Sequence, residues 1–178
     1  MSERIPLDPL TFGAEQVCFG CGPSNEHGWH LRFFREGDEV VTTFVPRSGL
    51  DGPPGIMHGG LQATLADELA GWALVGLLGR RGFTTSMTVR YMRPIRIGLP
   101  VEARARMISR KENTVILGVV LKQEERVGCR AQLAFMLPTL DSVERALKKP
   151  LPESWLHLIE PVEPEAPEAA TEPEDSGA

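Results

Sequence analysis

Two features that could act together on an electrophile lie between residues 55 and 67. The segment 55–60 (GIMHGG) leads directly into an apolar stretch, and Asp67 lies within that stretch. Glycines at a helix start expose backbone N–H groups at the positive end of the helix dipole, which suits a developing oxyanion. A loop that needs only tight backbone geometry would use the same glycines, so both interpretations stay open.

Asp67 is an unusual residue for the middle of a helix. Residues 63, 70, 71 and 74 share its helical face and are small or apolar. Aspartate is disfavoured in helix interiors and is almost never fully buried without a partner. Either Asp67 is solvated beside Glu68 on a polar strip, or it lies at the floor of a narrow pocket as a base or nucleophile.

The spacing of these features limits how they could cooperate. Gly59 and Asp67 are eight residues apart, which is about 12 Å along a helix axis. One carbonyl group cannot touch both. If both act on one bond, the helix start comes from one subunit and Asp67 from the other, as in an antiparallel dimer.

The elements that must position these residues follow from apolar periodicity. Residues 59–79 have the helical period and become apolar all round after Leu69, which is typical of a buried helix. Strand-like segments precede and follow that helix, at residues 30–35, 39–46, 83–93, 101–109, 113–124 and 127–137. We expect an α+β fold, an antiparallel curved sheet wrapped around one long buried helix. A sheet of this size cannot cover the helix alone, so we also expect dimerisation.

The remaining segments frame this domain. We expect a loop-rich N-terminal segment at 1–28, the main domain at 29–140, and a C-terminal segment at 141–160 with a short helix at 142–149 and a docking stretch at 155–159. The Pro- and Glu-rich stretch 161–178 has little to bury and is expected to be disordered. With 42% hydrophobic residues, the 178-residue chain has enough apolar surface for one core.

Charge and cysteine content narrow the function classes. Of 24 acidic residues, six lie in 161–178, which leaves 18 acidic against 19 basic residues elsewhere. A near-neutral body disfavours nucleic acid as a partner. The longest uncharged apolar stretch has eleven residues, short of the ~20 that cross a membrane. With no basic, apolar leader at the start and an odd number of cysteines, we expect no membrane and a cytoplasmic protein with reduced thiols.

Cysteines 18 and 21 form a possible metal motif. With His27 and His30 they spell C-x2-C-x5-H-x2-H, but zinc fingers have a longer gap between their pairs. We therefore expect packed thiols and no metal here, with Cys129 in the core. A zinc-dependent interaction module built on residues 18–30 is the competing hypothesis.

A family resemblance joins these observations. The segments GPPGIMHGGLQATLADELAGWA and TTSMTVRYMRPIRIG resemble the hotdog-fold acyl-CoA thioesterases of the 4-hydroxybenzoyl-CoA and phenylacetate-pathway superfamily. The form of the first segment is similar to that of the mammalian superfamily members 4 and 5. The resemblance covers about residues 18–138 and implies the hotdog fold and hydrolysis of an acyl-CoA to a free acid and coenzyme A, without a cofactor.

The resemblance also implies roles for individual residues. His58 and Gly59 match the element whose backbone N–H polarises the thioester carbonyl, and Asp67 matches the catalytic carboxylate, acting as general base or nucleophile. Thr84 matches a Ser or Thr that places water or the carboxylate. Its alternative role is that of an ordinary strand residue.

Substrate contacts and assembly are implied in the same way. Gly60 and the arginines at 90, 93 and 96 are expected to bind the substrate: Arg90, Arg93 and Arg96 could reach the coenzyme A phosphates or could simply be solvated. The expected assembly is a homodimer or a dimer of dimers. Where some relatives carry an Asn or Gln before the helix, this loop offers only Asp51 and Gly52.

Other functions remain in competition with hydrolysis. A non-catalytic acyl-CoA sensor would use the same groove, although a pure binder has no use for Asp67 beside an electrophile. Hydratases share the fold, but their helical Asp and His pair is not matched here. The apolar side chains Trp29, Phe33, Trp72 and Leu74 could line an acyl pocket or fill the core.

Overall fold

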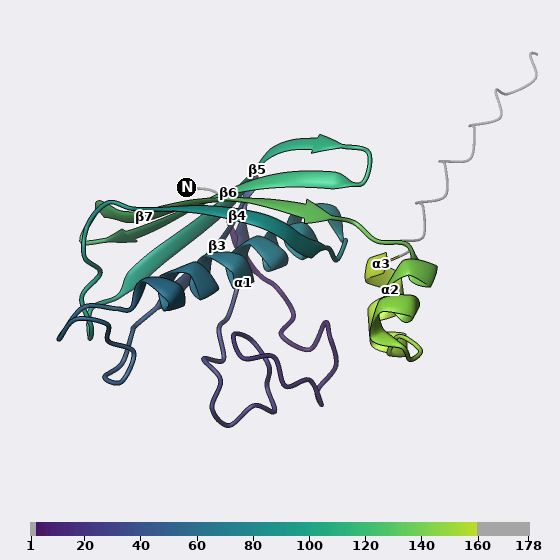
Figure 1. The fold of residues 1–178 in the computed structure, drawn as a ribbon, viewed down its shortest axis with the longest axis horizontal. Helices are drawn as coiled ribbons and strands as arrows, with labels where there is room; N and C mark the ends of the chain where they lie inside the picture. Colours follow the sequence, from purple (N-terminus) through teal and green to yellow (C-terminus); the bar gives the residue numbers. More distant parts are fainter. Residues whose placement is uncertain (1–2, 160–178) are drawn as a thin grey trace, which may run out of the picture.

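The computed structural model describes residues 3–159 and contains a seven-stranded antiparallel sheet with one long helix against one of its faces (Figure 1). The helix is α1 (Gly59–Leu78). The sheet has the order β1-β2-β3-β5-β6-β7-β4. Its strands are β1 (Arg4–Pro6), β2 (Phe34–Glu36), β3 (Glu39–Phe44), β4 (Phe83–Tyr91), β5 (Val101–Lys111), β6 (Thr114–Gln123) and β7 (Arg126–Met136). The expected α+β class is confirmed.

Alternation of apolar and polar residues gives the sheet one buried face. In β5, Val101, Ala103 and Ala105 are fully buried, whereas Glu102 and Arg104 between them are only partly buried. Such alternation is typical of an antiparallel strand with one face on the core. β6, which is apolar on both faces, pairs with β5 on one side and β7 on the other.

Helix α1 is buried because chain covers it on two sides. The sheet covers one side, and the irregular segment at 7–33 covers the opposite side (Figure 1). The rings of Phe12 and Phe33 lie 5.3 and 4.9 Å from that of Trp72. Burial of α1 therefore does not itself require a second chain, which removes one of the two reasons for expecting a dimer.

The N-terminal third differs from expectation at two places. No strand was predicted before residue 30, but Arg4–Pro6 forms β1 at the sheet edge. The strand predicted at 30–35 was wrong at its start, because β2 begins only at Phe34. His30 has a left-handed φ of 50°, and Leu31 N–H donates to the carbonyl of Gly20. The backbone there pairs with the 19–20 loop and not with a strand.

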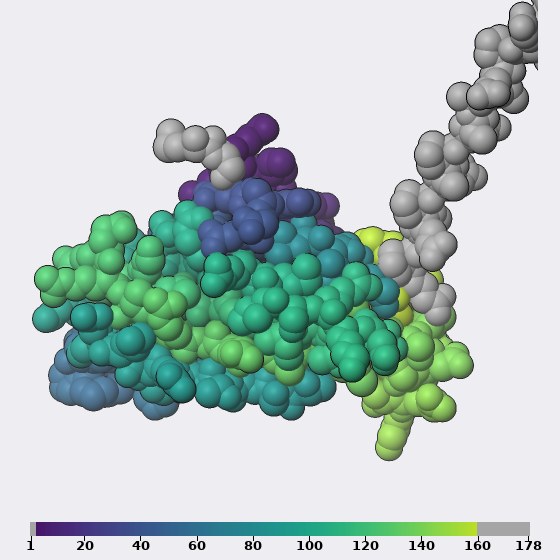
Figure 2. Space-filling model, turned by 90° about the horizontal axis from the view of Figure 1, so that it is seen from above, coloured from purple at the N-terminus to yellow at the C-terminus, as the bar shows by residue number. Residues whose placement is uncertain are grey.

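The C-terminal segment packs against the loop at 7–33 and against the chain that follows α1. It holds α2 (Leu140–Leu147) and α3 (Glu153–Ile159), which lie at one end of the molecule in the view onto the sheet (Figure 2). Trp155 Nε1 donates to the carbonyl of Phe12, and Leu158 and Ile159 are buried. The tail predicted to be disordered at 161–178 lies outside the described residues. Among helices in the described part, none has the length and apolarity needed to span a membrane.

Candidate functional site

A cavity of about 220 Å³ lies beside the middle of α1. Its walls come from α1, from the loop at 12–21 and from the first residues of β4. We call it the Asp67 cavity, and the polar or charged side chains used below line it: Cys18, Cys21, Asp67, Glu68, Arg81 and Thr84. Asp67 lies in the wall of this cavity and is partly buried.

Asp67 and Thr84 form a direct hydrogen bond in this cavity. Thr84 Oγ1 donates to Asp67 Oδ1 at 2.7 Å. The pairing of β4 with β7 shifts register between Thr84 and Ser86, an irregularity of the kind that re-aims a side chain at a strand end. The family resemblance implied that Thr84 places water or the carboxylate, and in the structure its hydroxyl contacts Asp67.

The start of α1 forms the second half of the candidate site. His58 is the N-cap, and its Nδ1 accepts the Gly60 N–H at 3.0 Å. Tyr91 Oη donates to the Gly59 carbonyl at 2.9 Å. Among residues 3–159, no acceptor takes the Gly59 N–H. Gly59 therefore keeps a donor at the positive helix end, whereas the Gly60 donor is already used.

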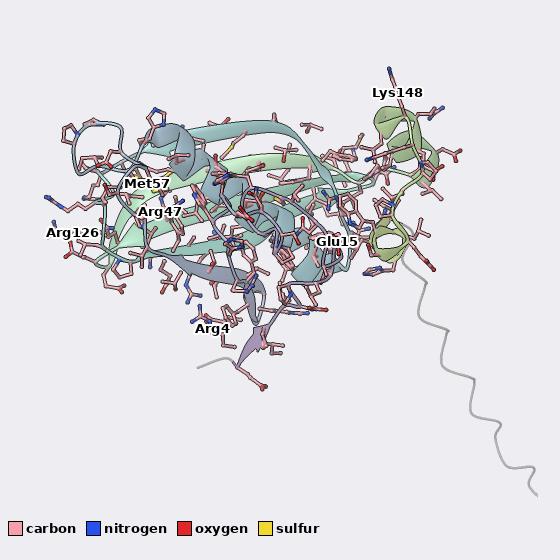
Figure 3. The ribbon with its side chains drawn as sticks, turned by 90° about the horizontal axis from the view of Figure 1, so that it is seen from below. Arg4, Glu15, Arg47, Met57, Arg126 and Lys148 are labelled. Carbon is pink, nitrogen blue, oxygen red and sulfur yellow. The ribbon has the colours of Figure 1, made fainter. Side chains whose placement is uncertain are left out.

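The loop before α1 is tied down on both sides. Asp51 accepts the Gly55 N–H at 2.8 Å and the Gly49 N–H at 3.1 Å through its two carboxylate oxygens. Met57 N–H donates to Ile95 O at 2.8 Å. Both carboxylate oxygens of Asp51 therefore already accept hydrogen bonds within the loop. Met57 lies at the end of the molecule opposite Lys148 of the C-terminal segment (Figure 3).

The two halves of the site are separated within one chain. β4 runs alongside α1 in the opposite direction, because its first residues meet Asp67 and its last residue, Tyr91, meets Gly59. Asp67 and Gly59 occupy the middle and the start of the same helix. The spacing argument made from the sequence therefore applies to this structure.

The three arginines do not gather around one cavity. Arg90 lines a second cavity of about 730 Å³, shared with side chains of β5, β6 and β7. Arg93 reaches toward the Val127 carbonyl at 3.4 Å. Arg96 bridges to Ile56 through the backbone, beside the loop that leads to α1.

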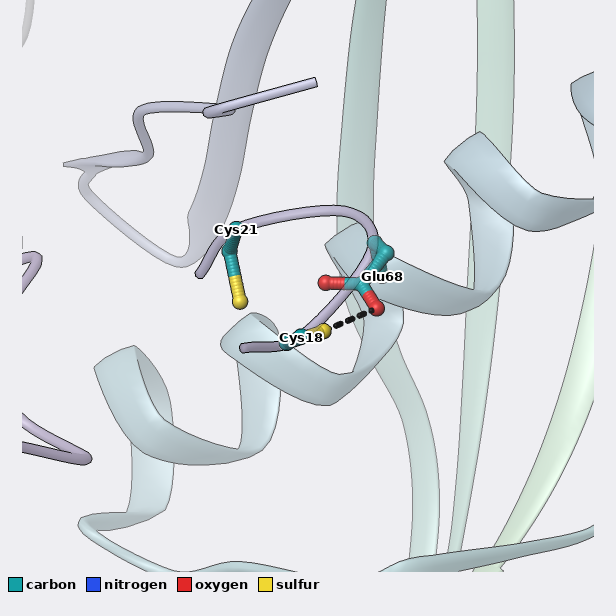
Figure 4. Close-up of side chains that lie close together, drawn as sticks. All are labelled: Cys18, Cys21 and Glu68. Atoms are coloured by element: carbon teal, nitrogen blue, oxygen red, sulfur yellow. Dashed lines mark hydrogen bonds between the residues drawn. The ribbon is translucent and has the colours of Figure 1, made fainter. Parts of the chain in front are cut away.

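The sequence did not identify the environment of Glu68. It was considered as a solvated neighbour of Asp67, but it lies against the loop that carries Cys18 and Cys21 (Figure 4). Cys18 Sγ and Glu68 Oε1 share a hydrogen bond of 3.1 Å. Only the spacing of Cys18 and Cys21 drew attention to this loop, and nothing in the sequence linked it to residue 68.

The side chains of Cys18, Cys21 and Glu68 all have shifted pKa values. A hydrogen bond from the Cys21 thiol, supported by nearby backbone N–H groups, lowers the pKa of Cys18 to about 5 against the opposing effect of burial. The pKa of Cys21 is raised because its thiol donates that bond and because it is buried. Burial, and then the charge of Cys18, raise the pKa of Glu68 to about 8.

Other sequence candidates lie apart from the cavity. His27 and His30 do not join Cys18 and Cys21 among the potential ligand clusters of the described chain. Cys129 is fully buried in β7, as predicted, and burial raises its pKa to about 11. Of the four apolar candidates for an acyl pocket, Trp72 lines the Asp67 cavity, and the rest pack in or against the core: Trp29, Phe33 and Leu74.

Comparison with known proteins shows that this chain is similar to thioesterases. Residues 54–130 match the family model described as thioesterase superfamily. Over 62 residues the chain is 42% identical to acyl-coenzyme A thioesterase THEM4 of Xenopus laevis. That match covers 35% of this chain and 28% of the relative, so the chain spans under a third of that protein's length.

Solved structures share the fold at lower identity. A thioesterase superfamily protein superposes with a TM-score of 0.64 at 24% identity, over 76% of this chain and 68% of that one. Thioesterase superfamily member 2 from Mus musculus gives 0.53 at 21% identity, over 57% and 82%. A hypothetical thioesterase with coenzyme A from Streptococcus pneumoniae gives 0.53 at 22%, over 56% and 80%. The hotdog fold expected from the resemblance is confirmed.

Proposed function

We propose that this chain, a member of the thioesterase superfamily, hydrolyses acyl-CoA thioesters to a free acid and coenzyme A. The observation that carries the proposal is the hydrogen bond from Thr84 to Asp67 in the wall of a cavity. It leaves the second carboxylate oxygen, Oδ2, available to a water molecule or a substrate carbon. The free N–H of Gly59 supports the proposal, because a backbone donor at a helix start stabilises an oxyanion.

The chemistry uses only these groups and water. With Asp67 as general base, its carboxylate takes a proton from water while the oxygen attacks the thioester carbonyl carbon. The carbonyl oxygen becomes an oxyanion, which the Gly59 N–H stabilises. The C–S bond then breaks, the acid is released, and the coenzyme A thiolate takes up the proton. With Asp67 as nucleophile, the same steps pass through an anhydride that water cleaves.

One such site needs two chains. β4 is the last strand of the sheet, and within residues 3–159 its outer edge pairs with no strand. Antiparallel pairing of two β4 edges about a two-fold axis near Met87 and Thr88 brings Thr84 of one chain toward Tyr91 of the other. Asp67 of one subunit then faces Gly59 of its partner. We therefore infer a homodimer joined along β4, alone or as half of a dimer of dimers.

The substrate class rests on related proteins and on basic residues. Structures of similar thioesterases hold coenzyme A and acetyl-CoA. Arg93 and Arg96 follow β4 on the side of the α1 start, where the coenzyme A phosphates would lie if the acyl group enters the Asp67 cavity. We propose that Arg90 also binds the coenzyme A phosphates, from the face of β4 that borders the second cavity. Gly60, whose N–H is bound by His58, is expected to contribute close backbone approach.

The test follows free thiol release from short, medium, long and aryl acyl-CoA substrates. We expect turnover by the unaltered chain and a loss of kcat of at least about 100-fold in Asp67→Asn, with acyl-CoA binding retained. Binding is measured separately by calorimetry. Tight binding without turnover by the unaltered chain would favour the sensor, and turnover that survives in Asp67→Asn would exclude Asp67 as the catalytic carboxylate.

A further inference from the structure

We propose that Cys18, Cys21 and Glu68 form a Zn²⁺ site in the wall of the Asp67 cavity (Figure 4). The two cysteines come from the N-terminal loop and the glutamate comes from the middle of α1. This site differs from the finger motif considered in the sequence, because Glu68 takes the place of the two histidines.

The distances suit one ion. The two sulfur atoms and a Glu68 oxygen all lie within 4.8 Å of one another, and Cys18 Sγ is 3.1 Å from Glu68 Oε1. Tetrahedral zinc with bonds of ~2.3 Å to sulfur and ~2.0–2.2 Å to oxygen separates neighbouring ligand atoms by roughly 3.5–3.8 Å. Small side-chain rotations are enough to bring the three atoms to these separations.

The loop is built so that the cysteines can reach Glu68. A Cβ on Gly20 would overlap the Glu68 side chain at 2.3 Å, and a Cβ on Gly22 would overlap the Cys18 backbone at 2.4 Å. Gly22 N–H donates to the Cys18 carbonyl at 2.9 Å, which closes the turn. A C-x2-C spacing in a tight, fixed turn is typical of chelating cysteines.

Glu68 is a partly buried carboxylate without a direct ion pair in the described part of the chain. Within residues 3–159 it forms no ion pair with Lys, Arg or His. Arg81 lines the same cavity, but its guanidinium stacks 3.7 Å from the Trp155 ring centre and 4.6 Å from that of Phe12. A metal ion held by these three side chains would give the Glu68 carboxylate a directly bound cation.

The donor set selects the metal. Two thiolates favour Zn²⁺ over Mg²⁺ or Ca²⁺, which prefer oxygen ligands. Two thiolates, a carboxylate and Zn²⁺ carry a net charge of −1, and Arg81 in the same cavity balances it. Three protein ligands leave a fourth tetrahedral position, which water from the cavity fills. The ion would thereby fasten the loop at 18–22 to α1 next to Asp67.

Cobalt provides the direct test, because tetrahedral Co²⁺ bound to thiolates absorbs in the near ultraviolet and visible. The full chain is stripped with a chelator, kept reduced and titrated with Co²⁺, and Zn²⁺ is then added in competition. We expect one equivalent per chain, displacement of Co²⁺ by Zn²⁺, and no displacement by Mg²⁺. Zinc X-ray absorption of the unaltered chain should show two sulfur and two light-atom ligands.

Single-residue variants test whether Cys18, Cys21 and Glu68 are the metal ligands. Cys18→Ser and Cys21→Ser should each remove about half of the thiolate-to-cobalt band, since its intensity follows the number of thiolates, and Glu68→Gln should weaken binding at least roughly tenfold. The matched controls His27→Gln, His30→Gln and Cys129→Ala should bind as the unaltered chain does. Folding of each variant is checked by circular dichroism. Absence of the band in the unaltered chain, a zinc spectrum without sulfur, or a full band in folded Cys18→Ser would overturn the proposal.

Discussion

At the scale of single residues, Asp67 is held by Thr84. Within the described chain, the Thr84 hydroxyl is the one side-chain group that hydrogen-bonds to Asp67. A hydrogen bond to an ionised carboxylate is worth more than one between neutral groups, and partial exposure reduces that value. The bond engages Oδ1 and leaves Oδ2 for the proposed reaction.

We expect Thr84→Ala to lower kcat about tenfold with little change in KM, because the carboxylate loses its orientation but the binding surface stays. Thr84→Ser keeps the hydroxyl and is the matched control, with near-normal kcat expected. Steady-state kinetics on the best acyl-CoA substrate measures both. Equal losses in the Ala and Ser variants would show that the methyl group matters and that the hydrogen bond does not.

Cys129 gives a residue-scale prediction for stability. Its thiol is fully buried and has a pKa of about 11, above the ordinary value of 9.0. The unfolded chain therefore loses this proton first as pH rises, so the stabilisation is complete below pH 9 and is lost as pH rises toward 11.

We expect the stability advantage of the unaltered chain over Cys129→Ala to shrink by roughly 1 kcal/mol between pH 8 and pH 10. Urea unfolding of both proteins at each pH gives the difference, and titration of all other groups cancels in it. An advantage that is constant over this range would mean that Cys129 ionises equally in both states.

At the scale of elements, the start of α1 carries two separate tasks. His58 caps the helix through its ring nitrogen and the Gly60 N–H, whereas the Gly59 N–H remains open. The resemblance assigned His58 to the catalytic element, and its geometry supports a positioning role, in which the cap holds the Gly59 donor in place.

We expect His58→Ala to cost about 1 kcal/mol of unfolding free energy through loss of the cap. His58→Asn should keep most of that stability and most of the activity, because asparagine is a good N-cap. Chemical denaturation and thiol release are measured on both variants. A stable His58→Asn protein without turnover would show that the imidazole itself takes part in the reaction.

At the scale of the whole molecule, the proposed site is complete only across two chains. Gly59→Pro removes the N–H, and proline suits both the first helical position and the extended backbone of His58, at φ −58° and ψ 135°. Gly59→Ala keeps the N–H and adds a Cβ 3.2 Å from the Tyr91 ring, so it controls for crowding.

A purified heterodimer of Asp67→Asn and Gly59→Pro chains, made with two affinity tags, tests the shared site. One of its two sites has both defects and the other has none, so we expect about half of the unaltered activity, although each parent homodimer is inactive. Light scattering measures whether the unaltered chain and the heterodimer are dimers in solution. Activity no higher than that of the parents would place both groups in one chain, and a monomer by light scattering would contradict the dimer directly.

Local patterns determined much of the fold. The strands from β3 onward and α1 were predicted within a few residues, because alternation and helical periodicity are local signals that the core enforces. β1 and the start of β2 were missed, since a three-residue edge strand and a left-handed His30 depend on contacts with distant segments. The pairing of Asp67 with Thr84 came from the family resemblance, and periodicity alone could not have supplied it.

The sequence by itself determined which residue types were available: a glycine-rich helix start, a helical carboxylate and a C-x2-C pair. Only the tertiary structure decided which of them meet. Glu68 lies 50 residues from Cys18 in the chain, yet their side chains are 3.1 Å apart. The physical reason is that α1 is covered by both the sheet and the loop at 7–33, and where that loop settles depends on its packing against Trp72 and Glu68. No local pattern encodes that contact.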